Sequence, residues 1–382
     1  MNTDLAFLVE LVTDWLYANA HNGDTNVQVT SSVLASSTGS KRQENQDRVA
    51  LVEVKRHSAL GGKLRAAAVF DGIGGMTDGG GAASLALASW AVYLGAGDSS
   101  RGLKTLMQSA ANYSNQIVFE KYLGRGGSTI AAAIFGSQGG VSLNAGDSKV
   151  FSIEDGVLTQ LSIDDTLSAR IAMKSPMLDP WMHPEKIDNR LAQFVGMGEG
   201  FEPHLVTLKT GTKQQKPSSV LLLSDGAYFV GNAILERILQ RGRVSTTETK
   251  QVLCMADWLG SDDNASIAFL TPSLDELSSM SAAETTFITI YCFGSSLTVL
   301  VPTDFSDPAK PGYRRVAART EIESNKTQPL IYITNFLEKP ATAPRKKKPA
   351  TQTSKRSKAK KPEAKTRKST EDFFLELIPH KK

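Results

Sequence analysis

Apolar and polar positions alternate in short segments along most of the chain, and this pattern predicts strands separated by tight turns. Glu154-Asp155-Gly156 is a strong hairpin signal. Residues 149–153 are expected to continue the strand over 141–145. Such spacing favours antiparallel sheet over alternating strand–helix–strand units. Strands are expected over 48–54, 66–70, 130–135, 141–145, 149–153, 218–223 and 265–270.

Helical spacing appears before and between these strands. Apolar residues from Leu5 to Leu16 recur every three or four positions, which predicts a short N-terminal helix. That helix either packs on the body of the protein or binds a partner. Residues 21–32 are polar and predict a loop, and the proline-containing segment 164–195 predicts an irregular flap. Further helices are expected over 82–96, 102–121, 231–241 and 246–259.

The C-terminal third follows a different pattern. Strand-like runs over 286–292, 297–301 and 330–334 either form a small extra sheet or extend the main one. Beyond about residue 338 large apolar side chains almost disappear, which predicts disorder. An isolated apolar cluster within 371–382 is either a short docking motif or a frayed end.

Charge is distributed unevenly, although the net charge of the whole chain is only +4. Residues 339–370 carry a net charge of +12, whereas residues 1–338 carry −7. The basic tail is therefore either a solvating tail or a tether to nucleic acid or an acidic partner.

Cysteine content and apolar run lengths bear on the compartment. Cys254 and Cys292 are too few for a disulfide framework, so a reducing compartment is expected. No apolar run approaches the roughly 18 residues that cross a bilayer. We expect a cytoplasmic protein that does not enter a membrane.

Acidic residues stand where several predicted strands begin or end. Asp71 follows the buried run 66–70 and precedes a glycine cluster that would allow close backbone approach to an ion or a phosphate. Each acid alone would be an ordinary turn residue. Carboxylates gathered together repel each other unless a cation neutralises them, and ligation by oxygen alone suits Mg²⁺ or Mn²⁺. The acids are Asp47, Asp71, Asp147, Asp225 and Asp263.

Eight ordered motifs between about residues 30 and 272 resemble the type 2C (PPM) metal-dependent serine/threonine phosphatases, in their bacterial form. The resemblance implies an α+β fold in which a central antiparallel β-sandwich is flanked by helices. The motifs are RQENQD (42–47), VFDGIGG (69–75), GGST (126–129), NAGDSKVF (144–151), LTQLSIDDT (158–166), VGMG (195–198), LLLSDG (221–226) and DDNAS (262–266).

Roles for individual residues follow from this resemblance alone. Arg42 would hold the substrate phosphate, Asp71 would bridge two Mn²⁺ or Mg²⁺ ions, and the carbonyl of Gly72 would ligate one of them. Asp47 would help form the metal site, either directly or through water, and Asp225 and Asp263 would complete the centre. Asp147 and Asp225 would form a third, weaker metal site. The implied reaction is hydrolysis of phosphoserine or phosphothreonine in proteins by metal-activated water, without a phosphoenzyme, in opposition to a serine/threonine kinase.

The chain departs from the family pattern at two positions. Gln46 stands where many members have glutamate, and Ile73 stands where some have a histidine proposed as general acid. The alternative to an enzyme is a catalytically inactive phosphatase-like binding module, tethered by its basic tail.

The resemblance also divides the chain. We expect a helix and loop over 1–29, followed by a catalytic domain over 30–272. We expect this catalytic domain to be monomeric. A strand-containing extension follows over 273–338, then the basic linker 339–370 and the segment 371–382.

Overall fold

The computed structural model describes residues 3–56, 62–97, 101–137, 139–174, 190–209, 218–239, 244–272 and 286–301, and four strands between 314 and 338. Predictions for 339–370 and 371–382 fall outside the described residues. The helices are α1 (Thr3–Ala18), α2 (Gly79–Ala96), α3 (Leu103–Tyr122), α4 (Leu167–Lys174), α5 (Asp225–Tyr228), α6 (Gly231–Ile238) and α7 (Thr246–Trp258).

Two large antiparallel sheets contain most of the described strands. The six-stranded sheet has the order β1-β2-β11-β10-β7-β8, and the seven-stranded sheet has the order β13-β12-β3-β4-β5-β6-β9. The strands of the first are β1 (Thr25–Val29), β2 (Ser32–Ser37), β7 (Lys149–Glu154), β8 (Val157–Gln160), β10 (Ser219–Leu223) and β11 (Ala265–Leu270). Those of the second are β3 (Arg48–Lys55), β4 (Lys63–Phe70), β5 (Ile130–Gly136), β6 (Gly139–Ala145), β9 (His204–Leu208), β12 (Thr286–Cys292) and β13 (Ser295–Val301).

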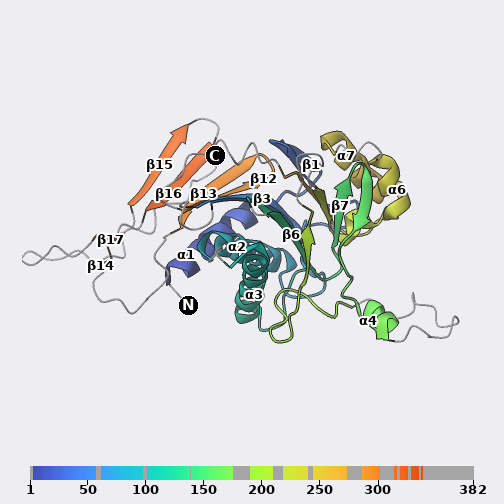
Figure 1. The fold of residues 1–382 in the computed structure, drawn as a ribbon, viewed down its shortest axis with the longest axis horizontal. Helices are drawn as coiled ribbons and strands as arrows, with labels where there is room; N and C mark the ends of the chain where they lie inside the picture. The colour runs from blue at the N-terminus through green and yellow to red at the C-terminus, as the bar shows by residue number, and fades with distance from the viewer. Residues whose placement is uncertain are drawn as a thin grey trace, which may run out of the picture. The chain divides into compact units, whose positions relative to one another are not determined.

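The sheets pack face to face, and helices cover their outer faces (Figure 1). Helices α1, α2 and α3 share an apolar cluster with the seven-stranded sheet. Helices α5, α6 and α7 share another with the six-stranded sheet, and a third cluster fills the space between the sheets. The predicted α+β sandwich flanked by helices is therefore confirmed.

Alternate side chains of strand β4 pack in two different apolar clusters, one on each face of its sheet. Successive side chains of a strand point to opposite faces. Ala66, Ala68 and Phe70 pack in the cluster with the helices, whereas Ala67 and Val69 pack between the sheets. All five are fully buried, which explains why this run is almost continuously apolar.

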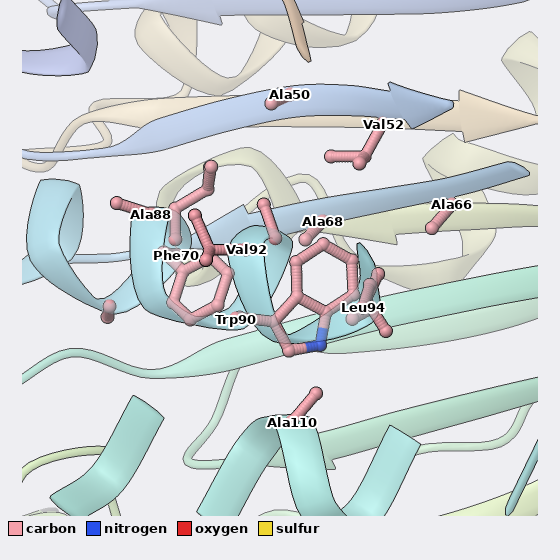
Figure 2. Packing of buried hydrophobic residues seen from close by; sticks show 14 of the residues in the cluster. Ala50, Val52, Ala66, Ala68, Phe70, Ala88, Trp90, Val92, Leu94 and Ala110 are labelled. Carbon is pink, nitrogen blue, oxygen red and sulfur yellow. The ribbon is translucent and has the colours of Figure 1, made fainter. Parts of the chain in front are cut away.

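Trp90 of α2 is the largest fully buried side chain on the helical side. Its ring centroid lies 6.1 Å from that of Phe70, at an edge-on angle of 64°. Figure 2 shows Trp90 between the strand that carries Ala66 and Ala68 and the helix that carries Ala110. The small alanines of the sheet make room for the indole, and this packing fixes α2 on the sheet.

Most predicted elements are present, but two local predictions are wrong. Residues 149–153 do not continue the strand over 141–145, because β6 and β7 belong to different sheets. The loop predicted over 21–32 contains β1 and the start of β2. Val27 and Val29 of β1 reach the cluster between the sheets, and the polar Gln28 lies between them in sequence.

Some of the C-terminal strands extend the main sheet, and others form small separate sheets. Strand β12 pairs with β3, so the β12–β13 hairpin extends the main seven-stranded sheet. Strands β15 (Arg319–Asn325) and β16 (Gln328–Thr334) pair with each other in a separate two-stranded sheet. A second such pair joins β14 (Arg314–Arg315) to β17 (Leu337–Glu338).

In the part of the chain that the structure describes, every helix is too short or too polar to span a bilayer.

Candidate metal centre

The pairing of β3 with β4 places two of the predicted acids together. Arg48 pairs with Phe70 at the end of this ladder, and Asp47 and Asp71 are the next residues on either strand. Asp71 is fixed further by the GGST segment, because the backbone N–H of Thr129 and the hydroxyl of Ser128 each donate to its carbonyl at 2.8 Å.

The other sheet contributes the remaining acids in a similar way. Leu223 at the end of β10 pairs with Lys149 at the start of β7. Two residues beyond this pair stand Asp225 and Asp147, and Asp263 lies two residues before β11, the other neighbour of β10. All five predicted acids are thus placed at strand ends by strand pairing.

Burial and mutual repulsion raise the pKa of most of these carboxyls. Burial raises the pKa of Asp47 to about 7, and the charges of Asp225 and Asp263 add to the rise. Burial raises the pKa of Asp71 well above its usual range, with contributions from the other four acids. Repulsion between charges weakens with distance and is screened by water, so these mutual effects indicate that the five carboxyls lie near one another.

The same causes act at the edge of the cluster. Burial raises the pKa of Asp147 to about 6, and the charge of Asp225 adds to this. Burial and the charge of Asp225 raise the pKa of Asp263, whereas Arg42 opposes the rise.

Several carboxylate oxygens in the cluster lack hydrogen-bond donors. Both oxygens of Asp47 and Oδ1 of Asp225 are buried without a hydrogen-bond partner in the structure. The hydroxyls of Ser224 and Ser266 lie close enough to Asp47 to lower its pKa, but neither makes a well-formed hydrogen bond with it. A buried anion without a donor is costly unless a cation satisfies it. These oxygens therefore fit metal ligation.

The donor set also indicates which ions fit and how. It consists of carboxylates and backbone carbonyls, which suits hard ions such as Mg²⁺ or Mn²⁺. Among the described residues, no three Asp, Glu, His or Cys side chains meet closely enough to enclose one ion by themselves. Ions at this centre would therefore need further ligands, such as the Gly72 carbonyl and water.

The glycines of the two acid-glycine turns have a packing role. A Cβ at Gly72 would lie 2.3 Å from the carbonyl oxygen of Gly79, at the start of α2. A Cβ at Gly226 would lie 2.1 Å from the carbonyl oxygen of Asn264. Both distances are too short for any side chain. In each turn glycine lets two backbone segments touch, and this contact holds the adjacent aspartate in place.

Arg42 lies at the rim of the cluster. Its Nη2 is 2.8 Å from Oδ2 of Asp263, and its Nε donates to the carbonyl of Asp262 at 3.0 Å. The side chain is 40% exposed, so its guanidinium is open to a ligand from solvent. The structure therefore brings the predicted phosphate ligand and a predicted metal ligand into one ion pair.

Comparison with known proteins identifies the fold. No protein-family model matches the chain, and no curated protein sequence matches it. Solved structures do match it. The serine/threonine phosphatase of S. agalactiae is 22% identical over 62% of this chain and 97% of its own, with a TM-score of 0.52. The chain has the type 2C phosphatase fold.

Two further structures agree. The phosphatase Stp1 from Staphylococcus aureus is 17% identical over 66% of this chain and 96% of its own, with a TM-score of 0.51. The phosphatase PstP/Ppp from Mycobacterium tuberculosis is 24% identical over 65% of this chain and 98% of its own, with a TM-score of 0.50. Nearly the whole type 2C fold is thus present, and about a third of this chain lies outside it.

Sequence reasoning missed Asn264, an asparagine that connects the segments beside the acidic cluster. The side-chain nitrogen of Asn264 donates to the carbonyls of Thr38 and Glu44 at 2.9 and 3.0 Å. Its oxygen accepts from the backbone N–H of Gln46 at 2.8 Å. Asn264 therefore fixes the segment that leads to Asp47. Asn264 lies within the DDNAS motif, directly after Asp263, and this position was the available signal for its role.

Asp165 was also missed, although it lies within the LTQLSIDDT motif. It is only 3% exposed and accepts from the backbone N–H of Gly146, the residue before Asp147, at 3.2 Å. Gln193 donates to it at 2.8 Å, and Nε2 of His204 lies 3.0 Å from its other oxygen. Asp165 thus joins the predicted third metal site to both ends of the flap segment.

The two departures from the type 2C pattern have simple environments. The side-chain oxygen of Gln46 lies against the start of α2, where a Cβ at Gly79 would approach it to 2.8 Å. The backbone N–H of Ile73 donates to the carbonyl of Gly127 at 3.1 Å. Neither side chain breaks the cluster of acids.

Proposed function

We propose that the protein is a metal-dependent phosphatase that hydrolyses phosphoserine and phosphothreonine in other proteins. The observation that carries the proposal is the cluster of five strand-end aspartates, with buried oxygens that lack donors, beside an accessible arginine. The type 2C fold supports the same activity, because the solved structures that share it are serine/threonine phosphatases.

Asp47, Asp71, Asp225 and Asp263 would hold two Mn²⁺ or Mg²⁺ ions, together with the carbonyl of Gly72. Such ions, when bound, supply a water of lowered pKa for in-line attack on phosphorus. Asp147 would contribute, with Asp225, to a third and weaker metal site. Asp165 positions the loop that carries Asp147.

Arg42 would bind the phosphate oxygens of the substrate. A planar guanidinium donates two parallel hydrogen bonds to a phosphate and stays charged at any working pH. Asp263, which now pairs with Arg42, would then ligate a metal ion, while Arg42 would bind the phosphate. Ile73 cannot transfer a proton, so the leaving group would take its proton from water or another group.

The proposed reaction implies partners of known chemistry. The substrates are phosphorylated proteins, and a serine/threonine kinase would supply them. The tethering of nucleic acid or an acidic partner by residues 339–370 stays a prediction, as does the cytoplasmic location. Deletion of 339–370 followed by a filter-binding assay at low and high salt would test the tether.

The test of the proposed function is hydrolysis of a phosphoserine peptide with and without Mn²⁺. We expect turnover with Mn²⁺, none in excess chelator, and none from the Asp71→Asn variant in a folded protein. Full activity of the wild-type protein in excess chelator would refute the metal mechanism. A folded wild-type protein that is inactive with both Mn²⁺ and Mg²⁺ would favour the inactive binding module.

A further inference from the structure

A groove of about 540 Å³ lies between α1, the start of α2 and the end of α3. Figure 1 shows these three helices together on the outer face of the seven-stranded sheet. The floor of the groove is apolar and includes Val9, Leu85 and Ile117. The rim carries four exposed acids, which are Glu10, Asp14, Asp78 and Glu120.

The groove favours a positively charged occupant. Lys121 is the one basic side chain among the described residues that line it. Two helices also end there, since Tyr17 lies in the last turn of α1 and Tyr122 is the last residue of α3. Helix C-termini carry partial negative charge, which adds to that of the acids, and Asp78 caps the opposite partial charge at the start of α2. An apolar floor under an acidic rim fits a peptide segment with lysines or arginines beside an apolar residue.

One turn of helix separates this groove from the acidic centre. The carboxylate of Asp78 accepts from the backbone N–H of Gly81 at 3.0 Å and from the hydroxyl of Tyr122 at 2.9 Å, on the groove side. On the other side, the carbonyl of Gly79 lies directly against Gly72. The groove and the predicted metal ligands therefore share the first turn of α2.

A second connection runs through Arg48. Its guanidinium carbon lies 5.8 Å from the ring centre of Tyr17, which lines the groove. Its Nη1 donates to the carbonyl of Asp47 at 2.8 Å. Along the chain, Asp71 and Asp78 are seven residues apart, which spans at most about 25 Å. A substrate segment of similar length could occupy both places at once.

We propose that this groove docks a basic segment, with one apolar anchor, of the same phosphoprotein whose phosphoserine or phosphothreonine is hydrolysed at the acidic centre. This proposal rests on the proposed function. The groove would select substrates by a segment a few residues from the phosphate, and the metal centre would carry out the reaction on any phosphate presented to it.

The first test measures binding alone, with the full chain. The probe is a fluorescein-labelled, unphosphorylated peptide that carries three arginines and one leucine, and anisotropy gives its affinity. We expect the triple variant Glu10→Gln/Asp14→Asn/Glu120→Gln to weaken binding about tenfold, as loss of three exposed charge pairs implies. The matched control is Asp155→Asn/Glu199→Gln/Glu236→Gln, which removes the same charge elsewhere and should bind as wild type. Asp78 is left intact because it caps α2.

The second test measures substrate selectivity in the presence of Mn²⁺. Its substrates are phosphoserine peptides with a block of arginines on the N-terminal side of the phosphoserine, with the same block on the C-terminal side, or with a neutral block. We expect the block on one side to lower KM about tenfold in wild type. The triple variant should lose this preference yet hydrolyse p-nitrophenyl phosphate, which is too small to reach the groove, at the wild-type rate.

Three outcomes would overturn the docking site. The first is equal binding of the peptide by the triple variant and its control. The second is a substrate preference that survives in the triple variant. The third is a concentration-dependent dimer that the triple variant abolishes, which would assign the groove to a second copy of the chain. Absence of hydrolysis of every substrate by wild type, with binding intact, would instead refute the proposed function.

Discussion

Nη2 of Arg42 lies 2.8 Å from Oδ2 of Asp263, so the predicted phosphate ligand is paired with a predicted metal ligand. The two residues are far apart in sequence and meet because the segments before β3 and β11 lie at the same end of the sandwich. The pair keeps the guanidinium at the rim of the acidic cluster, and it partly offsets the repulsion that Asp225 exerts on Asp263.

Removal of this arginine should weaken substrate binding more than it weakens metal binding. For Arg42→Ala we expect kcat/KM for a phosphopeptide to fall about a hundredfold, because a hydrogen bond between charged groups is worth roughly 1.5–3 kcal/mol. Arg42→Lys should recover part of the loss, since it keeps the charge without the planar fork. Steady-state kinetics at saturating Mn²⁺ checks both, and an unchanged kcat/KM in Arg42→Ala would contradict the assigned role.

Neutral substitutions within the cluster should abolish activity without unfolding the protein. Asp71→Asn and Asp225→Asn each remove one negative charge from a set of carboxyls that repel each other. We therefore expect both variants to fold as well as wild type when chelator is present, and to lose Mn²⁺-dependent turnover. Circular dichroism melting and phosphopeptide hydrolysis are the measurements, with Asp155→Asn as a surface control. Unfolding of both variants in chelator would mean that these acids stabilise the fold.

The metal-free protein should lose stability as pH rises. The pKa of Asp47 is raised from 3.8 to about 7 in the folded protein, so the folded state holds its proton more tightly than the unfolded chain does. Stability from this group is complete below pH 3.8 and is lost as pH rises towards 7. Between pH 5 and 8 the loss should be roughly 2–3 kcal/mol, and Asp147 adds a smaller loss of the same sign.

Urea unfolding in chelator measures this loss, with Asp47→Asn as the comparison. The variant should become more stable than wild type as pH rises from 5 to 8, because its amide does not ionise. A difference between the two proteins that does not change with pH would show that Asp47 has an ordinary pKa.

Asp165 should act on the third metal site through the loop before Asp147. Asp165→Ala leaves the buried donors of Gly146 and Gln193 without their acceptor, which we expect to destabilise the protein by about 3 kcal/mol. Asp165→Asn keeps one acceptor oxygen and should fold better, but should need more Mn²⁺ for half-maximal activity. Asp155→Asn, at the exposed turn between β7 and β8, is the control.

Calorimetry of Mn²⁺ binding, independent of activity, checks the same point. The weakest binding event should be weakened or lost in Asp165→Asn and retained in the control. If both variants bind Mn²⁺ as wild type does, Asp165 does not position Asp147.

The acidic cluster could be predicted from sequence because each acid adjoins an apolar run, and the pairing of such runs is enough to bring their ends together. Asp71 after β4 and Asp225 after β10 show this most clearly. The role of Asp165 could not be predicted, since a buried acceptor and a turn aspartate look alike in sequence. Its side-chain partners, Gln193 and His204, lie 28 and 39 residues further along the chain, which is too far for a local sequence pattern to relate them to Asp165.

The errors in the fold prediction have similar causes. The short turn between β6 and β7 gives no sign that the chain leaves one sheet for the other, because tight turns also join neighbours within a sheet. Strand β1 was missed because it lies at a sheet edge, and its two valines alone make a weak alternating pattern. In both places tertiary packing decides what local preference leaves open.

The origin of the acids in two different sheets has a mechanical consequence. Asp47 and Asp71 adjoin strands of one sheet, whereas Asp225 and Asp263 adjoin strands of the other. Their separation therefore depends on how far one sheet slides over the other, and the apolar layer that includes Val220 and Phe135 sets that offset. A change of side-chain volume in this layer would alter the affinity for ions without touching any ligand, and bound ions would in turn resist shear between the sheets.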